Sequence, residues 1–266
     1  MYLFAKYIKI YYDITIINLK EQDLKKKNNK KPFFRFVKCI LRIFKRKPKI
    51  INLNDEELED GAIYLTNHCA ASGPLMYELY FPKLFRFWGT YEMCGNLKQR
   101  WGYLANVYFP NKKHFPKWIS KIFATFATPF MHMFYKGMQV IPTYPDSRLR
   151  TTLKTSFEEL DKDINLIIFP ENSSDGYHAE LKEYFAGFLL LAKYYYKYRG
   201  KNLKIYNMYY CKKKNKLIID KAVYYLDLIK GNKTAKEIAN DFKEQVNNLY
   251  HTYCVNDEKQ KQTKID

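Results

Sequence analysis

The 266-residue sequence is short of the patterns that mark several large classes of protein. Its five cysteines are odd in number and include no Cys-x-x-Cys pair, which excludes a disulfide framework and a zinc ribbon and makes a reducing cytoplasmic compartment the default. The histidines have no metal-ligand spacing. A Gly-x-Ser-x-Gly elbow, a Walker loop and a dinucleotide-binding fingerprint are also missing. The sequence therefore predicts no metal site and no redox cofactor.

Acidic residues are scarce, and long uninterrupted apolar runs are absent. With 46 basic and 27 acidic side chains, the formal charge is +19, which predicts attraction to a polyanion, either nucleic acid or an anionic membrane surface. The segment 1–19 is apolar in part, but Lys6, Lys9 and Asp13 interrupt it. This segment predicts a peripheral helix or strand. It does not have the pattern of a secretory signal or of a membrane-spanning helix.

Residues 32–47 have the pattern of a basic amphipathic helix, opened by Pro32 and closed by Pro48. At about 100° per residue, apolar and basic side chains fall on opposite sides. The apolar side has Phe33, Phe36, Val37, Ile40, Leu41 and Phe44, and the basic side has Arg35, Lys38, Arg42, Lys45 and Arg46. We expect this helix to dock reversibly on an anionic membrane. The alternative is that its apolar side packs on the domain.

Two short apolar strands are each followed by an ionisable side chain. The first, 61–65, leads into Thr66-Asn67-His68, and the second, 164–169, leads into Pro170-Glu171. In an open α/β sheet, crevices form beyond the carboxyl ends of the strands, and a neutral imidazole there can accept a proton from a substrate hydroxyl. The alternative for His68 is a hydrogen-bonded turn histidine without a catalytic role.

Together, the two loops resemble the glycerolipid acyltransferases, the family that includes the lysophosphatidate acyltransferases. That family has Asn-His-x4-Asp after one strand and Phe-Pro-Glu-Gly-Thr-Arg after a later one. Asn67-His68 and Phe169-Pro170-Glu171 match these motifs in identity and order, and residues 137–143 take the place of the motif Gly-x-x-Phe-Ile-x-Arg. The resemblance spans residues 50–250.

Three positions depart from the family motifs. Gly73 stands where the first motif has its aspartate, Thr143 replaces an arginine, and Asn172-Ser173-Ser174 replaces Gly-Thr-Arg. In the family, the aspartate orients the histidine and the arginines hold the acceptor's phosphate. Arg148, at the start of a predicted helix over 146–160, is our candidate replacement for the phosphate clamp, although a solvated side chain is the alternative.

The resemblance implies an acyl transfer in phospholipid biosynthesis. His68 is then the general base, Glu171 holds the acceptor, and the thioester donor is acyl-CoA or an acyl carrier protein. The predicted substrate-binding residues are Asn67, Ser72, Gly73, Asn172, Ser173, Ser174, Thr143 and Arg148. Because the aspartate is missing, either another group, such as Ser72, Glu92 or Glu171, orients the histidine, or the protein is a degenerate family member that binds lipid without turning it over. The changed arginines leave a neutral glycerolipid, a glycolipid or an amino-lipid open as acceptor.

We predict one α/β domain with a mixed central sheet flanked by helices. Residues 1–50 form a membrane-associating helical extension, 51–255 the acyltransferase-like domain, and 256–266 a polar tail. Further helices are expected over 75–81, 115–135 with a break at Pro129, 180–198 and 234–250, and further strands over 84–90, 138–141, 203–210 and 216–225. A peripheral acyltransferase on the cytoplasmic face of the membrane is the leading hypothesis. A lipid-binding homologue without activity and a nucleic-acid binder are the alternatives.

Overall fold

The computed structural model describes residues 32–173 and 176–255. The predictions for residues 1–31, for Ser174 and for the tail from residue 256 lie outside the described residues. The helices are α2 (Pro32–Phe44), α3 (Ser72–Tyr80), α4 (Tyr91–Cys94), α5 (Leu97–Tyr103), η1 (Leu104–Lys112), α6 (Lys117–Met138), α7 (Leu149–Leu160), α8 (Gly187–Arg199), α9 (Tyr225–Ile229), α10 (Ala235–Tyr250) and η2 (His251–Val255), of which η1 and η2 are π-helical. The strands are β1 (Lys49–Asn52), β2 (Ile63–Thr66), β3 (Phe85–Thr90), β4 (Ile141–Thr143), β5 (Asn165–Ile168), β6 (Lys204–Cys211), β7 (Lys216–Ile219) and β8 (Val223–Tyr224).

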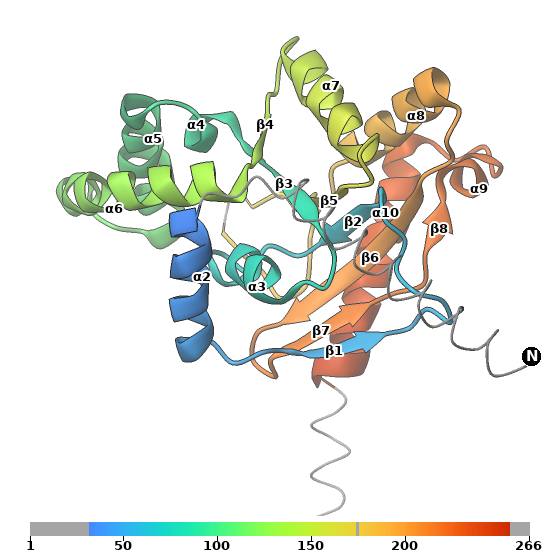
Figure 1. Cartoon of the computed structure of the whole chain (residues 1–266), viewed down its shortest axis with the longest axis horizontal. Coiled ribbons are helices and arrows are strands. Elements are labelled where there is room, and N and C mark those ends of the chain that lie inside the picture. The colour runs from blue at the N-terminus through green and yellow to red at the C-terminus, as the bar shows by residue number, and fades with distance from the viewer. Residues whose placement is uncertain (1–31, 174–175, 256–266) are drawn as a thin grey trace, which may run out of the picture.

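These strands form one mixed sheet in the order β1-β7-β6-β2-β5-β3-β4, with β8 paired to β6. The five strands from β6 to β4 run parallel to one another, whereas β7 and β8 pair with β6 in the antiparallel sense. Helices flank the sheet (Figure 1). The predicted fold class, a single α/β domain with a mixed sheet flanked by helices, is confirmed.

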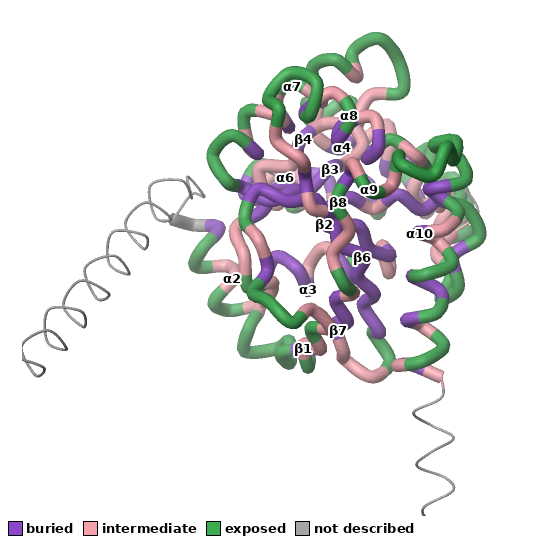
Figure 2. The backbone as a smooth tube through the Cα atoms, turned by 90° about the vertical axis from the view of Figure 1, so that its right-hand side faces the viewer, coloured by how far each residue is buried: buried purple, intermediate pink, exposed green. Residues whose placement is uncertain are grey.

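The core lies on both faces of this sheet, as the buried central strands in Figure 2 indicate. Side chains alternate along a strand, so Ile63 and Leu65 point into the layer formed with α7, α8 and α10. Tyr64 points into the opposite layer with α2, α3 and the end of α6. Because β2 is covered on both faces, all four of its residues are buried, which explains its continuous apolar sequence.

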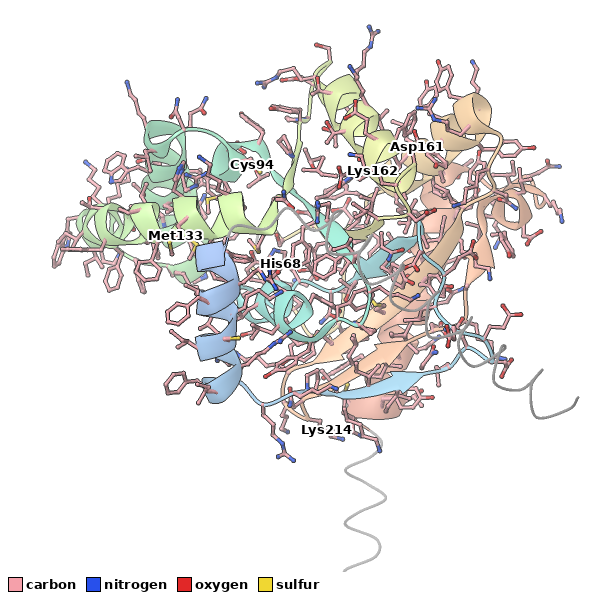
Figure 3. All side chains as sticks on the ribbon, viewed as in Figure 1. His68, Cys94, Met133, Asp161, Lys162 and Lys214 are labelled. Carbon is pink, nitrogen blue, oxygen red and sulfur yellow. The ribbon has the colours of Figure 1, made fainter. Side chains whose placement is uncertain are left out.

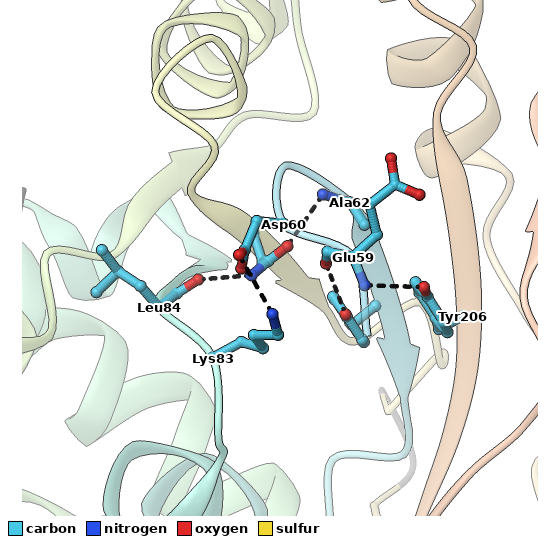
Figure 4. A network of polar contacts seen from close by, with 8 residues as sticks. Glu59, Asp60, Ala62, Lys83, Leu84 and Tyr206 are labelled. Carbon is cyan, nitrogen blue, oxygen red and sulfur yellow. Dashed lines mark hydrogen bonds and ion pairs between the residues drawn. The ribbon is translucent and has the colours of Figure 1, made fainter. Parts of the chain in front are cut away.

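A polar network at the start of β2 and β5 fixes how these strands lie beside each other (Figure 4). The fully buried Asn165 accepts a hydrogen bond from the Ala62 N–H at 3.0 Å and donates one to the Leu84 carbonyl at 2.8 Å. In the resulting parallel register, Leu65 lies opposite Ile168. The chain therefore leaves the carboxyl ends of β2 and β5 side by side.

The predicted helix over 180–198 is wrong in its first part. Residues 181–186 are not helical, Tyr184 pairs with Glu171 in an isolated antiparallel bridge, and α8 begins only at Gly187. Asn247 of α10 causes this, since its side chain bonds the N–H and the carbonyl of Leu181 at 2.8 and 3.0 Å. A tertiary contact thus satisfies backbone groups that a helix would otherwise pair.

The predicted strand over 138–141 is also displaced. Helix α6 continues through Pro129 to Met138, and Gln139, with a φ of 54°, ends it in the left-handed conformation before β4 begins at Ile141. The predicted helix over 234–250 is confirmed, with the capping box between Thr234 and Glu237. Within the described ranges 32–173 and 176–255, no helix is both long and apolar enough to cross a bilayer.

Candidate active site

His68 and Glu171 lie beyond the carboxyl ends of the neighbouring parallel strands β2 and β5. Each is the third residue after the opposed pair Leu65 and Ile168, so the two loops start at the same level. The ring of Phe169 packs on the His68 imidazole with centroids 4.6 Å apart. His68 lies inside the molecule close to α3 (Figure 3). The structure therefore brings together the two predicted catalytic residues, which are far apart in the sequence.

The backbone of the His68 loop orients the imidazole. Cys69 and Ala70 have φ values of 50° and 53°, and this pair of left-handed residues turns the Ala70 carbonyl back toward the ring. His68 Nδ1 lies 2.8 Å from that oxygen. A carbonyl only accepts hydrogen bonds, so Nδ1 carries the proton and Nε2 keeps its lone pair. The group that orients the imidazole is thus the main-chain carbonyl of Ala70, in place of the side chains of Ser72, Glu92 and Glu171 suggested from the sequence.

The imidazole is held in its neutral form. Burial lowers the pKa of His68 to about 4, and the positive charge of Lys112 lowers it further, while the hydrogen bond to Ala70 acts in the opposite direction. At neutral pH the ring is uncharged. Nε2 is then available to accept a proton from a bound hydroxyl.

The Glu171 carboxyl titrates near neutrality. Burial raises its pKa to about 7, against the smaller effects of the His68 backbone N–H and of Lys112, both of which lower it. Neither carboxyl oxygen makes a hydrogen bond of good geometry with any residue in the described ranges. A buried carboxyl whose oxygens are so weakly partnered is costly in the free protein, and its raised pKa makes it a candidate ligand-binding group.

The position of the missing aspartate has no room for a side chain. A Cβ on the buried Gly73 would lie 2.1 Å from the His68 carbonyl oxygen and 3.0 Å from its carbonyl carbon. Both are backbone atoms, so a side chain here requires the loop itself to move. Glycine at this position is a condition for the loop conformation that turns the Ala70 carbonyl onto His68.

Lys112, at the end of η1, is a site residue that the sequence analysis missed. Its Nζ donates to Ser173 Oγ at 2.8 Å and to the Tyr177 hydroxyl at 3.4 Å, and the Tyr177 ring packs 4.8 Å from the His68 ring. Burial lowers the pKa of Lys112, whereas Glu171 raises it. No motif surrounds Lys112, and only the fold of residues 97–138 carries it to the site, so the sequence held no signal for it.

Asn67 and Asn172 hold the two loops, as the family resemblance implies. The buried Asn67 accepts from the Tyr210 N–H at 2.8 Å and donates to the Tyr210 carbonyl at 3.2 Å, which ties the His68 loop to β6. Asn172 donates to Glu183 Oε2 at 2.6 Å. Ser72 opens α3, and Ser173 is bonded to Lys112.

Arg148 and Thr143 lie apart from this cluster. The exposed Arg148 is paired with Asp146 at 2.6 Å and stacks 4.5 Å over the Tyr144 ring. Its charge is therefore already balanced, and in the described part of the chain no contact joins it to His68 or Glu171. Thr143 ends β4, two strands away from β5, and its hydroxyl is buried without a partner in the described ranges. Glu92 accepts a hydrogen bond from Thr90.

Comparison with known proteins adds no identification, because no family model and no curated protein matches this sequence. In the described ranges, no group of three His, Cys, Asp or Glu side chains is placed to hold a metal ion. What the geometry offers is a neutral imidazole, a carboxyl with a pKa near 7 and a lysine, of which the carboxyl is buried and the other two are half-buried. These groups suit proton transfer from a hydroxyl held between them.

The raised pKa of Glu171 predicts an unusual dependence of stability on pH. The folded pKa of about 7 exceeds the ordinary 4.5, so the folded state binds this proton more tightly and is most stable below pH 4.5. Stability is then lost as the pH rises toward 7. We expect Glu171→Gln to exceed wild type by about 3 kcal/mol in urea unfolding at pH 8, with the difference closing by pH 4.

Glu158→Gln, at an exposed position of α7, is the control and should show no such pH dependence. A Glu171→Gln protein less stable than wild type at pH 8 would mean that the carboxylate has favourable partners in the free protein.

Proposed function

We propose that the protein is an acyltransferase that moves a fatty acyl group from an acyl-CoA or acyl carrier protein thioester to a hydroxyl of a membrane lipid. The observation that carries this proposal is the pair of half-buried His68 and buried Glu171 beyond adjacent strand ends, with Nδ1 of the imidazole bonded to Ala70 and the carboxyl oxygens without a partner in the described ranges. The resemblance of the two loops to the glycerolipid acyltransferases supports the thioester donor.

In the proposed reaction, His68 Nε2 accepts the proton of the acceptor hydroxyl while its oxygen attacks the thioester carbonyl. The carbon–sulfur bond then breaks, and the departing thiolate takes the proton from the imidazolium. The Ala70 carbonyl keeps Nε2 directed at the hydroxyl throughout. Glu171 and Lys112 hold the acceptor.

An acceptor screen tests this function. The full chain is incubated with radiolabelled palmitoyl-CoA, or with the palmitoyl ester of an acyl carrier protein, and total membrane lipid, and labelled products are identified by mass spectrometry. We expect a new acyl ester that requires the protein. Liposome binding without product from either donor would instead identify a lipid-binding homologue that has lost the activity.

We also infer a peripheral position on the cytoplasmic face of the membrane. Helix α2 lies against α6 (Figure 1), where the buried Phe34 packs on Phe134 with ring centroids 5.3 Å apart. Beyond this contact both helices expose large apolar side chains, although Val37 and Leu41 of the predicted apolar side of α2 are half-buried. The exposed side chains are Phe36, Ile40, Ile43 and Phe44 of α2 and Trp118, Ile122, Phe123, Phe126 and Phe130 of α6. We name this set the apolar rim.

Exposed basic side chains lie on the same two helices as the apolar rim. Arg35, Arg42 and Lys45 are exposed on or next to α2, and Lys117 and Lys121 on α6. Exposed apolar and basic side chains on the same two helices match an anionic bilayer, because the apolar groups can enter the headgroup boundary while the cations face lipid phosphates.

Charged substitutions in the apolar rim should release the protein from membranes. Ile43 and Phe126 are 79% and 78% exposed, so Ile43→Asp and Phe126→Asp change little inside the fold. We expect each to weaken binding to phosphatidylglycerol liposomes by about tenfold in a sedimentation assay, since each removes the burial of one large side chain.

Ile229→Asp, an exposed position on α9, is the matched control and should bind liposomes as wild type does. Equal loss in all three variants would refute the apolar rim as the docking surface. Salt-sensitive binding of oligonucleotides in place of liposomes would favour a nucleic-acid partner.

A further inference from the structure

Tyr184 faces Glu171 across the short bridge that closes the candidate active site. Hydrogen bonds from the Asn172 N–H to the Glu183 carbonyl at 3.2 Å and from the Phe185 N–H to the Pro170 carbonyl at 2.7 Å flank the pair. Residues opposed in this way project to the same side of the ladder with neighbouring Cβ atoms. Burial, followed by the charge of Glu171, raises the pKa of Tyr184.

Three buried polar atoms of this pair have no hydrogen-bond partner in the described ranges. They are the two carboxyl oxygens of Glu171 and the hydroxyl oxygen of Tyr184, in side chains whose residues are 8% and 7% exposed. Each unpaired buried group costs roughly 1–3 kcal/mol. The three atoms, on residues opposed in one bridge, are therefore a preformed set of acceptors and donors for a polar ligand.

The number of available hydrogens limits which ligand satisfies this set. A reacting hydroxyl has one hydrogen, and in the proposed reaction it points to His68 Nε2. The same hydrogen is then not available to the Glu171 carboxylate, which needs a donor of its own. Of the neighbouring cations, Lys112 is bonded to Ser173 and Tyr177. A second hydroxyl of the ligand supplies such a donor.

We propose that the acceptor carries a second hydroxyl on the carbon next to the reacting one, and that Glu171 and Tyr184 bind this second hydroxyl. The second hydroxyl donates to Glu171 and accepts from the Tyr184 hydroxyl, which pairs the groups that the free protein leaves open. Tyr184 is then a specificity-determining residue for a vicinal diol. This inference rests on the proposed function for the role of the reacting hydroxyl, whereas the diol binding stands independently of turnover.

The proposed diol site is tested with two acceptors that differ by one hydroxyl, hexadecane-1,2-diol and hexadecan-1-ol. Palmitoyl-CoA is the donor for both. We expect wild type to favour the diol by about a hundredfold in kcat/KM, because the alcohol leaves two buried polar groups unpaired. Tyr184→Phe should raise KM for the diol about tenfold, with little change in kcat and no change with the alcohol. Tyr198→Phe on α8 is the control with an exposed ring.

A thermal-unfolding measurement separates this inference from the proposed function. Without ligand, Tyr184→Phe should melt at or above the wild-type temperature, since only an unpaired hydroxyl is removed. The diol should raise the wild-type midpoint more than the alcohol does, and Tyr184→Phe should lose that difference. This pattern without acylation of either probe would refute the acyltransferase and support the diol site. Equal responses to both probes, or an unchanged preference in Tyr184→Phe, would overturn the diol site.

Discussion

His68→Ala should reduce acyl transfer by about 10²–10⁴-fold, because it removes the neutral imidazole that accepts the hydroxyl proton in the proposed reaction. The effect should fall on kcat, since the imidazole acts on the proton that leaves in the transition state. The measurement is steady-state transfer from radiolabelled palmitoyl-CoA to the acceptor found in the lipid screen.

The pH profile gives this prediction a second readout. The pKa of His68 is lowered to about 4 by burial, so the wild-type rate should not fall near pH 6.5, where an ordinary histidine gains its proton. A change of the rate near pH 7 should instead reflect the titration of Glu171 and should be absent from Glu171→Gln. His251→Ala, at an exposed histidine of η2, serves as the control. Retention of most activity in His68→Ala would exclude the imidazole as the base.

Gly73→Asp, which recreates the aspartate of the family motif, should abolish activity rather than improve it. Its Cβ would lie 2.1 Å from the His68 carbonyl oxygen, and the loop would have to open to accommodate it. Opening separates His68 from the Ala70 carbonyl, so the imidazole loses its orientation. We expect a loss of transfer comparable to that in His68→Ala, and a destabilisation of about 1–3 kcal/mol in urea unfolding from the strained backbone.

Gly73→Ala distinguishes the steric cause from the charge, since a methyl group alone should already remove most of the activity. Ala71→Asp places the same carboxylate two residues earlier, at the exposed N-cap position of α3, where an acidic group is favourable. This control should keep its stability and activity. Higher activity in Gly73→Asp than in wild type would show that the aspartate is accommodated and useful.

The fold class could be predicted because the apolar runs of the sequence are short and separated by turn residues, as in β2 and β5. The capping box at Thr234 likewise signals a helix start from local chemistry alone. The prediction failed at residues 180–186, where the helical spacing of apolar residues is present but Asn247 of α10 takes the backbone bonds of Leu181. A contact with a residue 66 positions away has no local signature.

The candidate site was predictable in its two ionisable residues, because both directly follow strands. Their juxtaposition follows from the pairing of β2 with β5, which the sequence did not specify. Lys112 and Tyr184 could not be predicted from the sequence. Lys112 lies at the end of the π-helix η1, and Tyr184 lies in a bridge where a helix was predicted. Arg148 was a poor candidate for a different reason, because Asp146, only two residues away, already balances its charge.

The hydrogen bond from His68 to a main-chain oxygen has a genetic consequence. A carboxylate that steadies a histidine can be deleted by a single codon change, whereas the Ala70 carbonyl is present whichever residue is encoded there. Saturation mutagenesis of residues 66–74 should therefore reveal no side chain that takes the role of the family's aspartate in orienting His68. It should instead reveal that Gly73 tolerates no larger side chain and that Cys69 and Ala70 must keep their left-handed backbone conformation. Loss of activity at these three positions should then depend on side-chain size and backbone conformation and not on a particular functional group.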